Sequence, residues 1–206
     1  MNYLISENDN VKKITFFVPD DPTRRVIKEE ISSVLGIIGE EKSNSLYMCI
    51  KELINYLTAV NILKLTAKFV NFDSKLSLLL NESYLTYFRE RFKASGKAIA
   101  IVIKNVNDGV IIEIINSEPI PEEHEREIRA ILRDLSSGKE FSLSLSGESY
   151  NFVSSIVMTW LILRDMGVDT SLFRIGNRDN KTFIWIEIPL SQSYISVRKA
   201  FERVQG

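Results

Sequence analysis

Two apolar segments joined by a short turn constrain the fold of this chain more than any other feature. Ala98–Ile103 and Val110–Ile115 are rich in isoleucine and valine, a composition typical of β-strands. Asn107-Asp108-Gly109 lies between them, and Asp-Gly readily adopts the positive φ angles of a tight hairpin. Because a hairpin pairs its strands antiparallel, we predict a sheet that is largely antiparallel.

Further strands and helices are predicted on both sides of this hairpin. Ile14–Val18 is a β-branched and aromatic run, and Leu172–Ile175 and Thr182–Ile188 flank turn residues as a second hairpin. Apolar residues at helical spacing fill the remaining segments. They predict helices from Asp20 to Ile38, from Ser43 or Asn44 to Leu65, from Leu76 to Phe92, from Glu122 to Leu135, from Tyr150 to Met166 and from Tyr194 to Val204.

This order of elements predicts the fold class. Helices that alternate with hairpins must bury their apolar faces against the sheet that the hairpins build. We therefore predict an α+β fold, a two-layer sandwich with a mixed, mostly antiparallel sheet covered by helices on one face. A chain of 206 residues suits one domain. We expect that domain to span 1–206, with the first strand and helix as an N-terminal extension.

Composition excludes several classes of function. The net charge of −1 argues against nucleic acid as a partner, because proteins neutralise phosphates with an excess of Lys and Arg. The single Cys49 excludes an internal disulfide, and with one histidine it leaves no ordinary zinc site. The N-terminus lacks the features of a signal peptide, and no apolar run reaches the roughly 20 residues of a membrane span. We expect a cytoplasmic protein that binds a protein partner or a second copy of itself, and no membrane.

Three segments resemble a known superfamily. They are LYMCIKELINYLTAVN at 46–61, VIIEIINSEPIP at 110–121, and a long helix that leads through Gly167 into the second hairpin and ends in Ile188-Pro189-Leu190. Together they resemble the GHKL, or histidine-kinase-like ATPase, superfamily of gyrase-type, chaperone-type and histidine-kinase-type nucleotide-binding domains, over about 46–190. The resemblance implies a Bergerat-type sandwich, a place in bacterial-type signal transduction, and a site for ATP and magnesium.

The first sequence box of that superfamily corresponds to the segment 46–61. In the family its Glu orients water in members that hydrolyse ATP, and an Asn four residues later binds the magnesium ion. Here Glu52 is present, Tyr56 stands at the Asn position, and Asn55 comes one residue early. One residue turns a side chain by about 100° around a helix, so we expect Asn55 to miss the magnesium position.

The second box corresponds to the end of the strand 110–115. The family has an Asp there that accepts a hydrogen bond from adenine, followed by glycines that let the backbone approach the base. Here Asn116 takes the Asp position, Ser117 follows it, and Glu118 and Ile120 replace the glycines. The resemblance therefore implies a weaker acceptor beside a more crowded turn.

The third box is a glycine-rich turn that holds the phosphates at the start of the last long helix. The corresponding residues are Asn151, Val153 and Ser155, none of which is glycine. Val153 is β-branched and disfavours positive φ, so we expect no phosphate-binding turn. The segment 136–149 takes the place of the family's ATP lid, and it would serve equally as a surface loop.

Three functional hypotheses follow. The first is a signalling protein, a pseudokinase, that has lost ATP, magnesium and catalysis and acts through protein–protein contact, with no metal or cofactor. Its relic nucleotide pocket consists of Glu52, Asn55, Tyr56, Asn116, Ser117, Asn151, Val153 and Ser155. The alternative is an ATP-binding regulator or kinase, similar to histidine kinases or to anti-sigma-factor kinases, that uses a variant pocket with ATP and magnesium. The third is an interaction protein with only a superficial likeness to the superfamily.

Several other residues are expected to be structural. His124 lies in an acidic run and is predicted to be at the surface. Cys49 is predicted to be a small buried hydrophobic residue. Arg89, Arg91 and Lys93 lie among aromatic residues, a pattern that could contact nucleic acid or anionic lipid. The helical spacing of Tyr84, Phe88 and Phe92 instead favours a position in the core.

Overall fold

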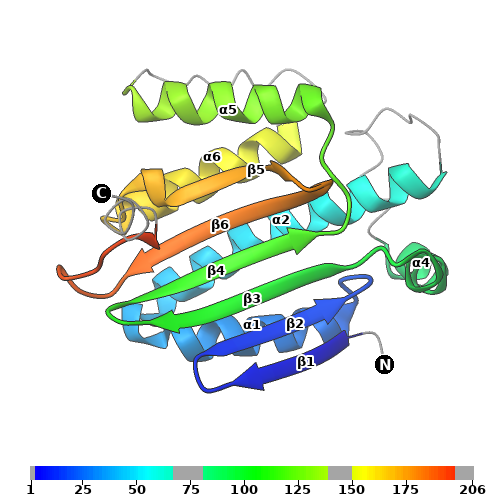
Figure 1. The fold of residues 1–206 in the computed structure, drawn as a ribbon, viewed down its shortest axis with the longest axis horizontal. Helices are drawn as coiled ribbons and strands as arrows, with labels where there is room; N and C mark the ends of the chain where they lie inside the picture. Colours follow the sequence, from blue (N-terminus) through cyan, green and yellow to red (C-terminus); the bar gives the residue numbers. More distant parts are fainter. Residues whose placement is uncertain (1–2, 67–80, 139–149, 198–206) are drawn as a thin grey trace.

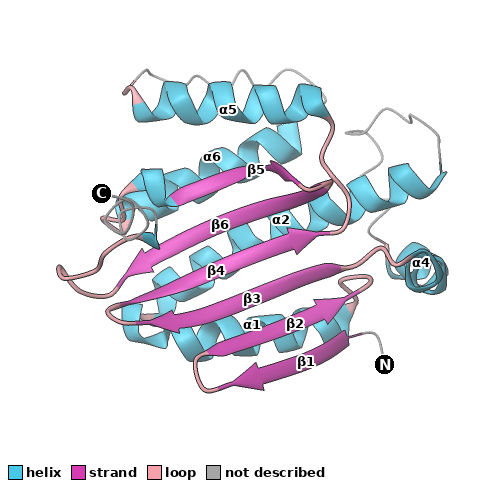
Figure 2. Ribbon diagram, in the orientation of Figure 1, coloured by secondary structure: helices cyan, strands magenta, loops and turns pink. Residues whose placement is uncertain are grey.

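The computed structural model describes residues 3–66, 81–138 and 150–197, with only the backbone for 66 and 150–153. Within them the chain is an α+β fold with six strands in one open sheet, ordered β1-β2-β3-β4-β6-β5 (Figures 1 and 2). The strands are β1 (Tyr3–Asn8), β2 (Val11–Phe16), β3 (Ile99–Val106), β4 (Gly109–Asn116), β5 (Phe173–Arg178) and β6 (Lys181–Pro189). The helices are α1 (Asp21–Leu35), α2 (Glu40–Thr66), α4 (Glu82–Ser95), α5 (Glu122–Ser136) and α6 (Tyr150–Asp165), with short 3-10 turns at Gly36–Ile38 and Thr170–Leu172.

The sheet differs from the prediction in one respect, because every pairing of the described strands is antiparallel and the sheet is not mixed. The connection between β2 and β3 explains this. Helix α1 runs back across the sheet and α2 returns, so that β3 begins at the end of the sheet where β2 stops (Figure 1). The chain therefore enters β3 antiparallel to β2, as it would after a hairpin.

Helices α1, α2 and α6 lie behind the sheet in Figure 1, and their apolar faces meet one face of the strands. Alternate strand residues point toward this layer, as expected from the two-residue period of a strand. They are buried together with the apolar faces of the helices in one main core cluster. In the central strands the core-facing residues are Ile99, Ile101, Ile103, Val110, Ile112, Ile114, Ile184, Ile186 and Ile188.

Local signals account for most helix ends. Asp20 caps α1, since its carboxylate accepts a hydrogen bond from the Thr23 amide at 3.1 Å. The same carboxylate pairs with Arg89 of α4 at 2.7 Å, which joins the two helices. Asn81 caps α4 through the Ser83 amide at 3.0 Å, and Gly96 ends it with φ of 67°. None of the helices that the structure describes is both long and apolar enough to cross a bilayer.

Several predictions about elements were wrong. Strand β1 was not predicted, and α2 begins at Glu40, so that Ser43 lies inside the helix and does not cap it. Tyr84 is exposed on α4, whereas Phe88 and Phe92 are buried as predicted. The tail is not helical over 194–196. The remaining predictions for 67–80, 139–149 and 198–204 lie outside the described residues.

The segment after β6 folds onto the sheet face that is opposite the helices. Its anchor is Glu187, a carboxylate with no exposed surface that points to this face. Glu187 accepts hydrogen bonds from the Tyr194 hydroxyl at 2.6 Å and the Val197 amide at 3.1 Å. It also accepts one from the Trp185 indole at 2.9 Å and forms an ion pair with Arg174. Four donors thus hold one buried charge and fix the chain beyond β6.

Candidate functional site

The predicted pocket residues whose side chains the structure describes do not gather around one space. The eight residues lie on α2, at the end of β4 and at the start of α6, and the described side chains among them have different neighbours. Glu52 and Ser155 line an open groove between α2 and α6. Asn55 lines a small cavity, and Tyr56 contacts α5.

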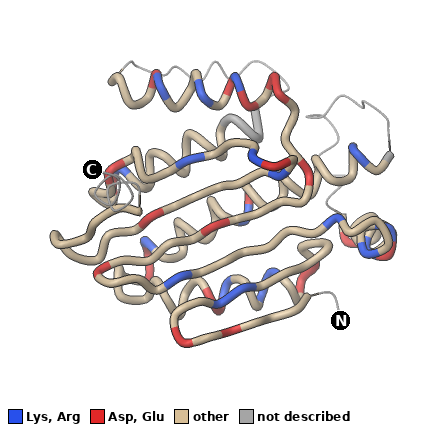
Figure 3. Tube along the Cα trace, viewed as in Figure 1, with Lys and Arg blue, Asp and Glu red and all other residues tan. Residues whose placement is uncertain are grey.

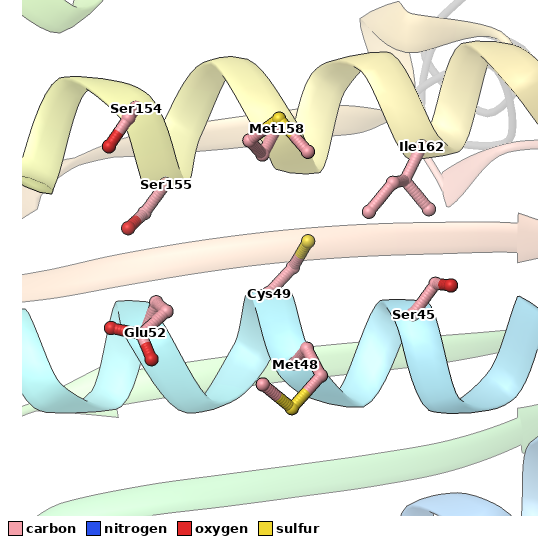
Figure 4. A pocket seen from close by; sticks show the side chains of 8 residues that line it. All are labelled: Ser45, Met48, Cys49, Glu52, Ser154, Ser155, Met158 and Ile162. Atoms are coloured by element: carbon pink, nitrogen blue, oxygen red, sulfur yellow. The ribbon is translucent and has the colours of Figure 1, made fainter.

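The groove has a cavity volume of about 450 Å³ and mixes apolar and polar side chains. Figure 4 shows Cys49 of α2 and Ser155 of α6 pointing into the space between the helices. Burial raises the pKa of the Cys49 thiol, and a hydrogen bond with the Thr159 hydroxyl acts in the opposite direction. The thiol therefore stays protonated at neutral pH and is a poor nucleophile. The lining residues are Ser45, Met48, Cys49, Glu52, Ser154, Ser155, Met158 and Ile162.

Asn55 faces a different neighbour from Glu52. It lines a cavity of about 10 Å³ together with Arg24, Ile27 and Tyr47, next to α1. Its Nδ2 donates a long hydrogen bond of 3.4 Å to Glu52, while its Oδ1 is buried and has no partner among the described residues.

Tyr56 stands where the resemblance implies a magnesium ligand, and its surroundings are apolar and aromatic. The ring is buried, and its hydroxyl forms a hydrogen bond of 2.9 Å with Nδ1 of His124 on α5. The two ring centroids are 6.3 Å apart. Burial raises the pKa of Tyr56 far above its ordinary value, so the phenol stays neutral and provides no anionic ligand. His124 was predicted to be at the surface, and in the structure it is half-buried and contacts Tyr56.

The end of β4 is held by its neighbouring strands. The Ser117 amide donates to the Ala98 carbonyl, and the Ser117 hydroxyl accepts from the Ala98 amide, both at 3.0 Å. The Ile120 amide donates to Thr182 at 2.9 Å and to Asn177 at 3.1 Å. The turn that would have to approach a base is therefore tied to β3, β5 and β6.

Asn116 is the exception in this turn. Its side chain is fully buried, and its Nδ2 donates to the Glu118 carbonyl at 3.0 Å. Its Oδ1 is buried without a hydrogen-bond partner in the described part of the chain. The Glu118 carboxylate forms an ion pair with Lys97.

At the third box, 151, 153 and 155 all belong to α6, which begins at Tyr150. Their backbone is helical there, and a glycine-like turn is not present at these positions. The side chains of Asn151 and Val153 and the lid segment 139–149 are outside the described residues. Ser155 is buried, and its carbonyl accepts a hydrogen bond from the Thr159 hydroxyl at 2.7 Å, an ordinary contact within a helix.

Sequence reasoning did not identify Asn177 as a residue that holds the turn after β4 in place. Asn177 joins three segments, since it bonds to Ile120, to Thr182 and, at 2.9 Å, to Glu125 of α5. Burial acts to raise the pKa of Glu125, but hydrogen bonds from Arg129 and Asn177 and the charge of Arg129 together lower it. In the sequence Asn177 reads as a turn residue, so only the contact between distant segments shows its role.

The described residues include no group of three or more His, Cys, Asp or Glu side chains that could hold a metal ion. The groove between α2 and α6 offers one carboxylate, from Glu52, which falls short of such a group. Comparisons of the chain with protein-family models, with curated proteins and with solved structures find no match.

Proposed function

We propose that this chain has a histidine-kinase-like ATPase frame that no longer binds ATP and magnesium, and that it acts in signalling through protein–protein contact. The observation that carries the proposal is the contact between Tyr56 and His124. Tyr56 stands where the family has its magnesium ligand, and a buried neutral phenol is a poor substitute for an amide oxygen. Asn55, the nearest replacement, faces α1.

The arrangement at the end of β4 supports the same proposal. Adenine would need the backbone after Asn116 to remain open, and this turn is bonded to Ala98, Asn177 and Thr182. A nucleotide would have to break these hydrogen bonds, and each buried group left unpaired costs about 1–3 kcal/mol. Binding at micromolar strength releases about 8 kcal/mol in total, so this cost would remove a large share of it.

One observation favours a second candidate function, an ATP-binding regulator or kinase with a variant pocket. The Oδ1 atom of Asn116 is buried and has no partner among the described residues. Such an acceptor could receive the amino group of adenine, with Glu52 and Ser155 nearer the phosphates. This candidate requires the turn after Asn116 to open when a nucleotide arrives.

Isothermal titration of the protein with ATP and with ADP, each with magnesium, distinguishes the two functions. The proposal predicts no heat of binding in the micromolar range and no rise in melting temperature. Binding that is lost in Asn116→Leu and kept in Met158→Ala would establish the variant pocket instead. Met158 is the matched control because it lines the groove but offers no acceptor for a base.

A further inference from the structure

The two edges of the sheet are protected differently. At one edge, β5 lies beside α5, and Glu125 of α5 accepts a hydrogen bond from the Asn177 amide at 3.2 Å. At the other edge, β2 is the only neighbour of β1 among the described strands, and no described helix lies beyond β1 in Figure 1. An unpaired edge presents a row of free backbone donors and acceptors that another strand can join.

Strand β1 lacks the features that usually block such pairing. Its sequence, Tyr3–Asn8, contains no proline and no lysine, and its one charged residue is Glu7 near the turn (Figure 3). The Glu7 carboxylate is paired within the chain to Lys12 at 3.3 Å. Leu4 and Ile5 are 67% and 45% exposed. Exposed apolar residues on an unprotected edge are typical of a strand that pairs with another chain.

The hairpin fixes which residues of β1 face outward. Asn8 and Val11 flank its two-residue loop and are directly opposite each other. Residues that flank such a loop form a hydrogen-bonded pair, and the pattern alternates along the strand. The backbone N–H and C=O groups of Leu4, Ser6 and Asn8 therefore point toward β2. Those of Tyr3, Ile5 and Glu7 point away from the sheet, toward any strand that is added at this edge.

We propose that β1 pairs antiparallel with β1 of a second copy of this chain, around a two-fold axis at Ile5. In this register Ile5 lies opposite Ile5 of the second copy, and Tyr3 lies opposite Glu7. All three outward residues then exchange hydrogen bonds with the other copy, and no like charges meet. The strand is thus complementary to itself, which an interface with two-fold symmetry requires. The pairing joins two sheets into one with both helix layers on the same side.

This inference deepens the proposed function, on which it rests for the view that the chain acts by protein contact. Its test is the oligomeric state of the whole protein, measured by sedimentation equilibrium over a range of concentrations. The expected result is a dimer that Ile5→Lys converts to a monomer, since two lysines would meet at the axis. Ile37→Lys is the matched control, because Ile37 is 74% exposed on a different part of the surface. It should leave the dimer intact.

A second variant tests the register and does not depend on disruption. In Ile5→Cys the two cysteines lie opposite each other with Cα atoms about 5.5 Å apart, within the range of a disulfide. Oxidation should link the two copies. In Leu4→Cys the corresponding Cα atoms are about 8 Å apart and should not link. The native Cys49 is buried, so the wild-type protein is the control for any disulfide that forms without the introduced cysteine.

A monomeric wild-type protein, or a dimer that survives Ile5→Lys, would overturn the inference. Binding of an extended peptide of another protein at β1, in preference to a second copy of this chain, would also overturn it. These results would not affect the nucleotide titration, so loss of ATP binding can stand while the dimer fails. ATP binding by a dimer linked at Ile5→Cys would refute the proposed function and leave the surface assigned.

Discussion

The buried carboxylate of Glu187 gives the sharpest prediction about stability. Glu187→Gln keeps the shape of the side chain and removes its charge. Four groups donate to this carboxylate, from Arg174, Trp185, Tyr194 and Val197. The neutral amide of glutamine has only one oxygen that can accept these hydrogen bonds. Its NH₂ group would face the remaining donors, with which it cannot form hydrogen bonds. We therefore expect a substantial loss in the free energy of unfolding.

The magnitude follows from the surroundings of each donor. Removing one partner of a buried ion pair costs about 3–5 kcal/mol. The Arg174 side chain is 43% exposed and regains water, which places the cost at the lower end of this range. The Tyr194 hydroxyl can turn to accept, whereas the Val197 amide cannot. We expect a loss of about 3 kcal/mol, out of the 5–15 kcal/mol typical of a folded domain.

Equilibrium unfolding in urea, followed by far-UV circular dichroism, measures this loss. Glu113→Gln is the matched control: it lies on the same face of the sheet but has a single ion pair, with Lys104 at 3.0 Å. The Lys104 side chain is 32% exposed, so about 1 kcal/mol is expected there. Equal losses in the two variants would refute the reasoning, because the number of buried donors would then not matter.

Three further predictions concern residues of the core and the candidate site. Burial raises the pKa of Tyr56 above the ordinary tyrosine value of 10.0. Above about pH 10 the unfolded chain therefore loses a proton that the folded protein keeps, and the free energy of unfolding falls by up to about 1.4 kcal/mol per pH unit. Tyr56→Phe should show a shallower decline in urea unfolding between about pH 9 and 11, and an unchanged slope would contradict this. Gly109→Ala places a Cβ against the partly buried ring of Tyr194 and should lower the unfolding free energy by about 1–3 kcal/mol, whereas the Cβ of Gly36→Ala would meet no other part of the described structure within 4 Å and should not lower it. Finally, the cavity of about 10 Å³ beside Asn55 has room for one water molecule. This water should bridge Oδ1 of Asn55 and Nε of Arg24, two buried atoms without a hydrogen-bond partner in the described structure. A high-resolution crystal structure would show it, and an empty cavity would contradict the prediction.

Local patterns predicted the elements well where each depended on its own residues. The β3–β4 hairpin follows from its turn: Asp108 adopts φ of 65°, as the Asp-Gly sequence indicated. Asp20 caps α1, at the residue where this helix was predicted to begin. The α+β class follows from the order of such elements. Strand β1 was missed because YLISEN has little hydrophobic alternation and becomes a strand only by pairing with β2.

The candidate site was predicted less well, for a related reason. Asn55 was expected to miss the magnesium position because it comes one residue early on its helix, and in the structure it lines a small cavity next to α1. His124 was expected at the surface, yet it meets Tyr56 across 68 positions of sequence. No spacing rule connects residues that far apart, because their contact depends on how α5 lies against α2.

The sequence by itself therefore determined where most helices and strands lie, because each depends on side-chain chemistry and on backbone geometry over a few residues. The tertiary structure alone decided that Tyr56 is buried against His124, that the turn after β4 is closed, and that β1 leaves an open edge. Each of these depends on the packing of segments far apart in the chain, whose relative positions are set by burial of the whole core.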